Sequence, residues 1–144
     1  MQVIVQGKVQ AMIGSILVVD DDRDARMALA IRLTAEGFEV HEAAGGMDAL
    51  EMCQECRFDA VLLDASMPDM NGFDVCRRMR QGDDGDRMRI FFVTGASTPS
   101  ESFVDRCVET SGADGYFRKP FDARELVESV KASMPGERCE EVLP

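Results

Sequence analysis

The chain has 144 residues, and its 16 Lys and Arg against 27 Asp and Glu give a formal net charge of −11. This length fits one domain, and 45% hydrophobic with 30% charged residues is typical of a globular protein rather than a disordered one. The acidic excess disfavours non-specific binding to nucleic acid or to anionic membranes, because both surfaces attract Lys and Arg.

The hydrophobic pattern contains no candidate membrane span. Apolar runs such as Ile16–Val19 and Ala60–Leu63 are about four residues long, whereas a spanning helix needs about 20. Residues 1–15 also lack the charged and then apolar pattern of a secretory signal. We therefore expect a cytoplasmic protein without membrane contacts.

Apolar runs alternate with amphipathic stretches along most of the chain, which is the rhythm of strand–helix units on a parallel sheet. The predicted strands are Ile16–Val19, Phe38–Ala43, Phe58–Leu63, Arg89–Val93 and Gly115–Phe117. The predicted helices are one with Ala25, Ala28, Leu29 and Leu33 that ends at Gly37, then Gly46–Cys56, one with Phe73, Cys76 and Met79, Ser100–Thr110 and Asp122–Met134. Five such units predict an α/β fold, a doubly wound five-stranded parallel sheet with helices on both faces.

The predicted elements occupy residues 15–134, which we expect to form one domain. Residues 1–14 form an N-terminal extension and residues 135–144 a C-terminal tail, both too short to be second domains. Asp122, with Glu125 three residues later, is a helix-start pattern, and Pro135-Gly136 ends that helix.

Cys53 and Cys56 form a C-x-x-C motif in a chain whose five cysteines we expect to be reduced. Such a motif can serve zinc or redox chemistry. Zinc would need two further ligands, and His41 is the only histidine. A redox pair belongs at a helix N-terminus, whereas this one ends a helical pattern. We interpret both cysteines as small apolar helix residues.

Polar side chains follow four of the predicted strands, at the edge where sheets of this kind bind ligands. They are Asp20, Asp21 and Asp22 after the first strand, Asp64 after the third, Thr94 after the fourth and Lys119 after the fifth. Carboxylates about 4 Å apart repel by roughly 1–4 kcal/mol, a cost that Mg²⁺ removes. Lys pairs with phosphate, and a Thr hydroxyl can bond a phosphoryl oxygen. The set therefore suits phosphoryl transfer to a carboxylate beside Mg²⁺.

Four segments at these strand ends carry a family resemblance. They read ILVVDDD at Ile16–Asp22, VLLDASMPDMNG at Val61–Gly72, FVTG at Phe92–Gly95 and YFRKPF at Tyr116–Phe121. In this order they resemble the receiver domain of bacterial two-component response regulators, over about residues 15–134. The resemblance implies a flavodoxin-like sheet of order 2-1-3-4-5 and a stand-alone receiver similar to chemotaxis regulators.

The resemblance also implies roles for the acidic residues. Asp64 is expected to accept a phosphoryl group from a histidine kinase or a histidine phosphotransfer protein. The implied Mg²⁺ ligands are Asp20, Asp21, Asp64 and the backbone carbonyl of Ser66, with Asp21 binding directly and Asp20 through water.

Three further residues receive roles from the same resemblance. Thr94 is expected to bond a phosphoryl oxygen, and Lys119 to pair with the phosphoryl group. Tyr116 lies where the family has its switch residue, so Thr94 and Tyr116 are expected to move together on phosphorylation. The Lys119–Pro120 bond is expected to be cis.

We expect no attached output domain and no enzyme activity beyond self-phosphorylation and self-dephosphorylation. Output would then pass to an unknown protein target, without direct contact to nucleic acid. The expected docking surface is the fourth helix, the fifth strand and the fifth helix, including Tyr116, Arg118 and Val127.

The chain departs from the family pattern in two places. The stretch between Thr94 and Lys119 is a few residues longer than usual, at 97–100 or at 110–111. Ser66 and Ala96 stand where receivers place side chains that influence attack of water on the aspartyl phosphate. Neither is an acid or an amide, so we expect a comparatively persistent phosphorylated state.

Two other function classes compete with this interpretation. A phosphohydrolase of the haloacid dehalogenase class would use Asp20-x-Asp22 as its D-x-D motif and Asp20 as its nucleophile, but it needs an acidic pair after Lys119 that the chain lacks. A flavodoxin-like binding module would cradle a flavin phosphate in its first loop, where the three aspartates would repel it.

Overall fold

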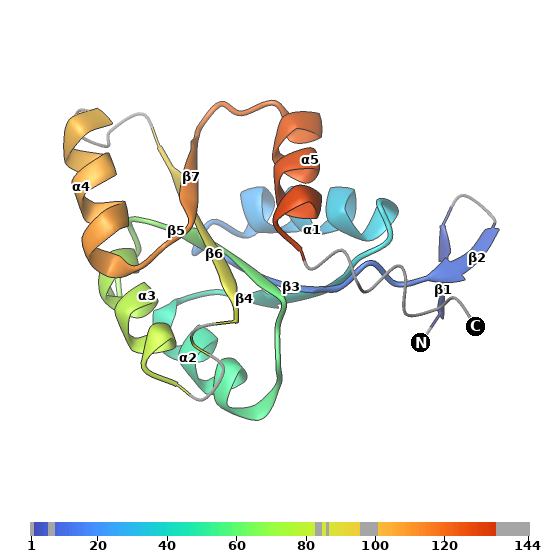
Figure 1. The fold of residues 1–144 in the computed structure, drawn as a ribbon, viewed down its shortest axis with the longest axis horizontal. Helices are drawn as coiled ribbons and strands as arrows, with labels where there is room; N and C mark the ends of the chain where they lie inside the picture. Colours follow the sequence, from blue (N-terminus) through green and yellow to red (C-terminus); the bar gives the residue numbers. More distant parts are fainter. Residues whose placement is uncertain (1, 6–7, 83–84, 86, 96–100, 135–144) are drawn as a thin grey trace.

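The computed structural model describes residues 2–5, 8–82, 85, 87–95 and 101–134, and for residues 2–5, 8–11 and 101–103 the backbone only (Figure 1). Among these residues, no helix has the length and apolar character that crossing a bilayer requires.

A five-stranded parallel sheet forms the centre of the fold. Its strands are β3 (Ser15–Val19), β4 (Glu39–Ala43), β5 (Ala60–Asp64), β6 (Arg89–Thr94) and β7 (Gly115–Arg118). They lie in the order β4-β3-β5-β6-β7, with every neighbouring pair parallel. Counted from β3, this is the order 2-1-3-4-5, so the predicted fold is confirmed.

Five helices cover the two faces of this sheet. They are α1 (Arg23–Ala35), α2 (Gly46–Glu55), α3 (Gly72–Arg80), α4 (Glu101–Ser111) and α5 (Ala123–Ser133). Helices α1 and α5 lie on one face, and α2, α3 and α4 on the other (Figure 1). Helices on both faces explain why the central strands are apolar throughout rather than alternating.

Strand β5 illustrates how the two faces are filled. All five of its residues are buried. Leu62 packs with side chains of α1 and α5, whereas Val61 and Leu63 pack with those of α2 and α3. Full burial of one such side chain contributes about 1.5–3 kcal/mol, so the sheet is stabilised from both sides. This packing fixes the position of Asp64, the last residue of β5.

Short polar residues stand at the N-cap positions of three of the helices. The side chains of Asp22, Asn71 and Asp122 accept backbone N–H groups in the first turns of α1, α3 and α5. The helix start predicted at Asp122 is therefore confirmed. Gly37, after α1, has a φ of 107°, a conformation that side chains other than glycine rarely adopt, and it ends the helix as predicted.

The N-terminal extension contains an element that the sequence analysis missed. Gln2–Val5 (β1) and Lys8–Ala11 (β2) pair as an antiparallel hairpin, which lies apart from the five-stranded sheet (Figure 1). The β-branched residues Val3, Ile4 and Val5 were the available signal. The division into extension, domain and tail stays a prediction.

Arg80, the last residue of α3, links several segments at the end of the sheet opposite to Asp64. Its guanidinium donates to the Gly112 carbonyl after α4 at 2.8 Å, to the Met88 carbonyl before β6, and to Asp114 Oδ2 before β7 at 2.9 Å. Asp114 Oδ2 also accepts the Ile90 N–H at 2.8 Å. One side chain thus ties the carboxyl ends of α3 and α4 to the start of two strands.

Candidate functional site

Three carboxyl groups gather at the carboxyl ends of β3 and β5. Asp20, Asp21 and Asp64 each offer an oxygen that lies within 4.8 Å of the others. Strands β3 and β5 are neighbours, and both end at this edge. Asp20 and Asp64 are only 7% and 9% exposed, whereas Asp21 faces solvent. The fold therefore brings together the three acids singled out in the sequence, and leaves the cluster open on one side.

Lys119 joins this cluster from the end of β7. Its Nζ lies 3.2 Å from Asp20 Oδ2, and its backbone N–H donates to the Thr94 carbonyl at 2.7 Å. The Lys119–Pro120 peptide bond is cis, as predicted. The ammonium group therefore lies beside the acids, although the two residues are 99 positions apart in the chain.

The surroundings of Asp64 raise the pKa of its carboxyl group above the ordinary value. Burial, and to a smaller extent the neighbouring Asp20, raise its pKa from 3.8 to about 6, against the Ser66 N–H and Lys119, which lower it. The Ser66 N–H donates to Asp64 Oδ1 at 3.1 Å. Three carboxyl groups face one ammonium group here, so a divalent cation with oxygen preference fits this donor set.

Thr94 and Tyr116 lie on the same face of the sheet. Tyr116 pairs with Phe92, and Thr94 is two residues beyond Phe92, so all three side chains point to the side of α3 and α4. Thr94 is fully buried, and its hydroxyl has no hydrogen-bond partner in the part of the chain that the structure describes. A buried hydroxyl without a partner costs free energy, so this atom is suited to bond an incoming ligand oxygen.

The loop after Asp64 is held by contacts that the sequence analysis did not foresee. Asp69 accepts the Gly46 and Met47 N–H groups at the start of α2, each at 3.1 Å, and these bonds lower its pKa. No side chain at the preceding position caps α2, because Gly45 stands there. The glycine pair before a helix was the available signal, but its partner lies 23 residues away.

Gly72 closes the same loop against the backbone of Asp64. Its N–H donates to the Ala65 carbonyl at 3.0 Å. A Cβ at this position would lie 2.8 Å from Ala65 Cα and even closer to the Asp64 carbonyl oxygen, so only glycine fits. This close approach explains the glycine that follows Asn71 in the sequence.

Asp22 lies outside the acidic cluster, although it belongs to the D-x-D pattern. Its Oδ1 accepts the N–H groups of Asp24 and Ala25, at 3.0 and 3.3 Å, and so caps α1. Asp122 is likewise occupied at the start of α5. Asp22, the second carboxylate of the D-x-D pattern, and Asp122, the nearest acid after Lys119, are thus used to begin helices.

The expected docking surface is corrected at one residue. Val127 on α5 is 1% exposed and packs in the core, because its position on the helix faces the sheet. It therefore offers no contact to a partner. Tyr116 and Arg118 on β7 are partly exposed. The predictions for residues 97–100 and Ala96 lie outside the described residues.

The C-x-x-C cysteines lie at the far end of α2. Cys53 is partly buried, and burial, together with Cys56, raises the pKa of its thiol to about 11. A redox cysteine needs the opposite shift, so the interpretation as a helix residue holds for Cys53. Cys56 follows the helix and is exposed.

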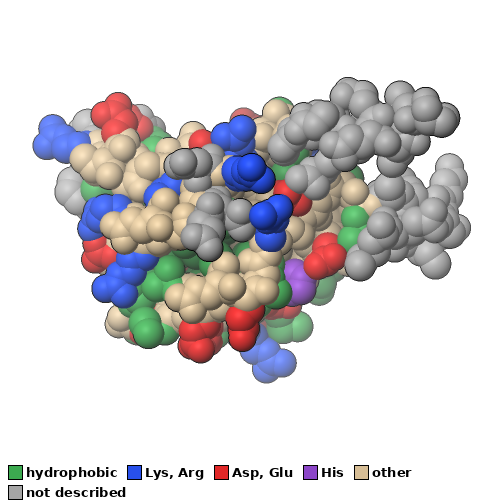
Figure 2. All heavy atoms as spheres, turned by 60° about the horizontal axis from the view of Figure 1, so that its bottom comes forward, with side chains coloured by type: hydrophobic (Ala, Val, Ile, Leu, Met, Phe, Trp, Pro, Cys, Tyr) green, Lys and Arg blue, Asp and Glu red, His purple; other side chains and the backbone are tan. Residues whose placement is uncertain are grey.

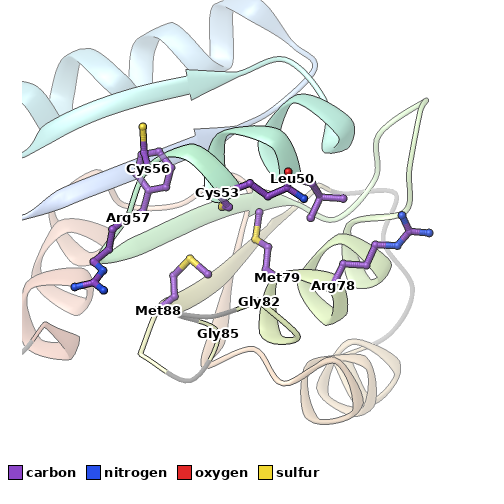
Figure 3. Close-up of a pocket in the computed structure, with 11 residues that line it drawn as sticks. Leu50, Cys53, Cys56, Arg57, Arg78, Met79, Gly82, Gly85 and Met88 are labelled. Atoms are coloured by element: carbon purple, nitrogen blue, oxygen red, sulfur yellow. The ribbon is translucent and has the colours of Figure 1, made fainter.

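These cysteines line a cavity of about 490 Å³ between α2, α3 and the start of β6 (Figure 3). In the view of Figure 3, the side chains of Cys53, Met79 and Met88 point toward one another, while those of Arg57 and Arg78 extend away at its two ends. None of the site residues expected from the sequence lines this cavity. It is therefore separate from the acidic cluster.

Charged side chains are mixed over the surface turned forward in Figure 2, where Lys and Arg occur among Asp and Glu rather than in a separate half.

The comparison with known proteins agrees with this site. The protein family described as "Response regulator receiver domain" matches this chain over residues 16–131. Response regulator MprA of Mycobacterium ulcerans is 38% identical over 126 residues, which is 88% of this chain and 52% of that protein. Response regulator MprA of Mycobacterium leprae is 39% identical, over 81% of this chain and 49% of that protein. The chain thus spans about half the length of these curated relatives, so the expectation of no attached output domain stays untested.

Solved structures that resemble this chain also include response regulators. The Vibrio cholerae chemotaxis protein CheY4 is 30% identical with a TM-score of 0.77, over 86% of this chain and 100% of that one. The Thermotoga maritima response regulator TrrA, solved in complex with Mg(2+)-BeF, is 32% identical with a TM-score of 0.72, over 83% of this chain and 98% of that one. The chain belongs to the family of response regulator receiver domains of two-component systems.

Proposed function

We propose that this protein is a cytoplasmic phosphoryl acceptor, whose receiver domain comprises residues 15–134. Asp64 accepts the phosphoryl group from the phosphohistidine of a histidine kinase or of a histidine phosphotransfer protein. The observation that carries the proposal is the gathering of Asp20, Asp21 and Asp64 within 4.8 Å beside Lys119.

The acidic cluster and the Ser66 carbonyl hold Mg²⁺ in this proposal. Asp21 is the exposed member of the cluster and binds the ion directly, while Asp20, whose Oδ2 already contacts Lys119, acts through water. Mg²⁺ favours a few carboxylate oxygens together with water and phosphate oxygens. When bound there, Mg²⁺ would neutralise charge on the phosphoryl oxygens. The complex of the relative TrrA with Mg(2+)-BeF supports this assignment.

The transfer itself needs an ionised Asp64. A carboxylate oxygen of Asp64 forms a bond to phosphorus while the bond from phosphorus to the histidine nitrogen breaks, and that nitrogen keeps the electron pair. With a pKa of about 6, Asp64 is mostly ionised at neutral pH. Lys119 then pairs with the incoming phosphoryl group, and the Thr94 hydroxyl bonds one of its oxygens, which satisfies its buried hydroxyl.

The change in Thr94 is passed to Tyr116, which shares its face of the sheet. Helix α4, strand β7 and helix α5 then present a changed surface to a downstream protein, through Tyr116 and Arg118. A shift from 1:99 to 99:1 between two surface states requires about 5.5 kcal/mol of difference in phosphoryl binding.

The experiment that tests the proposal is phosphoryl incorporation from a small phosphodonor such as acetyl phosphate, read by intact mass. Wild type is compared with Asp64→Asn, Asp20→Asn and the surface control Asp105→Asn on α4, with and without Mg²⁺. The expected result is a single Mg²⁺-dependent adduct in wild type and in Asp105→Asn, and none in Asp64→Asn.

Two other results would contradict it. Donor turnover that survives Asp64→Asn and vanishes in Asp20→Asn would identify a phosphohydrolase with Asp20 as nucleophile. No adduct and no turnover would identify a receiver fold that binds partners without a phosphoryl switch.

A further inference from the structure

Each polar group of Asp20 makes a hydrogen bond or an ion pair within the protein. Its N–H donates to the Ala43 carbonyl at 3.2 Å, its Oδ1 accepts the Asp22 N–H at 2.9 Å, and its Oδ2 lies 3.2 Å from Lys119 Nζ. The remaining group is the backbone carbonyl, which accepts a bond from Arg26 Nη1 at 2.8 Å. Three of these four contacts follow from the fold or from the expected site, whereas the bond to Arg26 comes from a side chain without an assigned role.

Arg26 lies on α1, about one turn after the cluster. Its side chain is 15% exposed, and its Nε donates to Glu42 Oε1 at 3.0 Å. Glu42 is on β4, the strand next to β3. The guanidinium is planar and rigid, so two bonds in different directions fix its orientation. The Arg26–Glu42 pair thus connects α1 and β4 to the peptide group that follows Asp20.

This peptide group joins Asp20 to Asp21, the two neighbouring acids of the cluster. Its orientation decides where both carboxylates point, because it is the turn between β3 and α1. We infer that Arg26, oriented by Glu42, is a positioning residue for the Mg²⁺ site. This inference rests on the proposed function, because it concerns the metal of that site.

A positioning role and a purely electrostatic role of Arg26 predict opposite changes in Mg²⁺ affinity when the side chain is removed. A guanidinium near a cation site repels the cation, so its removal strengthens Mg²⁺ binding if charge is all that matters. If Arg26 instead holds the Asp20–Asp21 peptide, its removal weakens Mg²⁺ binding, as the loss of residues that orient metal ligands does. The sign of the change therefore separates the two explanations.

The test measures Mg²⁺ affinity by isothermal titration calorimetry, on the full chain and without phosphodonor. Arg26→Gln is expected to raise the Mg²⁺ dissociation constant about tenfold. Arg26→Lys, which keeps the charge but loses the planar fork, is expected to weaken binding as well. Glu42→Gln, which leaves the Arg26–Asp20 bond in place, is expected to give a smaller weakening. The matched control is Arg32→Gln on the same helix, which pairs with Glu36 at 3.4 Å and is expected to bind like wild type.

A second readout uses metal-free protein. Amide hydrogen exchange at Asp22, whose N–H is bonded to Asp20 Oδ1, is expected to speed up in Arg26→Gln and to stay unchanged in Arg32→Gln. Unchanged or tighter Mg²⁺ binding in both Arg26 variants would overturn the inference while leaving the proposed function intact. Failure of wild type to bind Mg²⁺ would overturn both.

Discussion

Asp64 has to satisfy two conditions that oppose each other. It is buried at the end of β5, where the charged form is disfavoured, yet it must be ionised to attack phosphorus. Its pKa of about 6 is the balance between burial and Asp20 on one side and Ser66 and Lys119 on the other. A side chain in this balance makes metal-free protein sensitive to pH.

The first prediction concerns that sensitivity. The pKa of Asp64 is higher in the folded state than its ordinary value of 3.8, so its contribution to stability is full below about pH 4 and is lost as the pH rises through about 6. In metal-free protein we therefore expect Asp64→Asn to be more stable than wild type at pH 8, by roughly 1–2 kcal/mol after solvent screening. The difference should shrink at pH 5.

Urea unfolding in EDTA at pH 5 and pH 8 measures this difference. Asp105→Asn on α4 is the control, because it removes an acid whose side chain is exposed to solvent. An Asp64→Asn variant that is less stable than wild type at pH 8 would show that the acidic cluster is not under electrostatic strain.

The second prediction compares two glycines near the site. An added Cβ at Gly72 meets the backbone of Asp64 and Ala65, whereas at Gly95, next to Thr94, it meets nothing within 4 Å among the residues that the structure describes. Gly72→Ala is expected to lower the free energy of unfolding by about 2 kcal/mol, because the loop must move to make room. Gly95→Ala should change it by less than about 0.5 kcal/mol. Thermal and urea unfolding check both values, and equal destabilisation by the two variants would refute the steric argument.

At the scale of single residues, the sequence predicted which side chains form the candidate site, because residues at the carboxyl ends of parallel strands meet at one edge. They are Asp20, Asp21, Asp64, Thr94 and Lys119. Other residues that support the site escaped prediction. Asp69 and Arg26 act on backbone groups, 23 and 6 positions away in the chain, and a backbone group carries no signature in the sequence.

Among the elements, helix ends were the most predictable feature. Gly37 and Asp122 act locally, through backbone freedom and a short acceptor side chain, so their neighbours in the sequence are sufficient to identify them. The hairpin of β1 and β2 was not predicted, because the β-branched run Val3–Val5 is short and gives only a weak strand signal. The connection between α3 and α4 through Arg80 was also not visible, since it joins residues 32 and 34 positions apart.

The third prediction tests this connection. Arg80→Met removes the donor to the Gly112 carbonyl and one of the partners of the Asp114 carboxylate, and is expected to cost about 1.5–3 kcal/mol of stability. Arg77→Met on the same helix removes an exposed ion pair with Asp74 and should cost less than about 1 kcal/mol. Urea unfolding measures both. Equal effects of the two variants would mean that the several bonds of Arg80 stabilise the fold no more than one surface ion pair does.

At the scale of the whole molecule, the alternation of apolar and amphipathic segments was sufficient to predict the fold class. The strand order came from the family resemblance, because several orders satisfy the same alternation. The net charge of −11 adds repulsion throughout the molecule, so the packing of five helices on both faces of the sheet must supply the stability.

The fourth prediction concerns the N-terminal hairpin of β1 and β2, which lies outside the five-stranded sheet. The five-stranded sheet begins at Ser15, and the match to the family begins at residue 16. Deletion of residues 1–11 is therefore expected to change Tm by less than about 3 °C and to leave phosphoryl incorporation unchanged. Calorimetry and intact mass of the shortened chain check this. A much lower Tm would show that the hairpin stabilises the domain.

Tyr116 also determines the intrinsic fluorescence of the protein. The chain contains no tryptophan and a single tyrosine, so excitation near 280 nm reports on one side chain. That side chain lies on β7, at the edge of the sheet and on the same face as Thr94. The unlabelled protein therefore carries its own optical probe at one defined position. Its emission can follow phosphoryl binding or the docking of a tryptophan-free partner without any added dye.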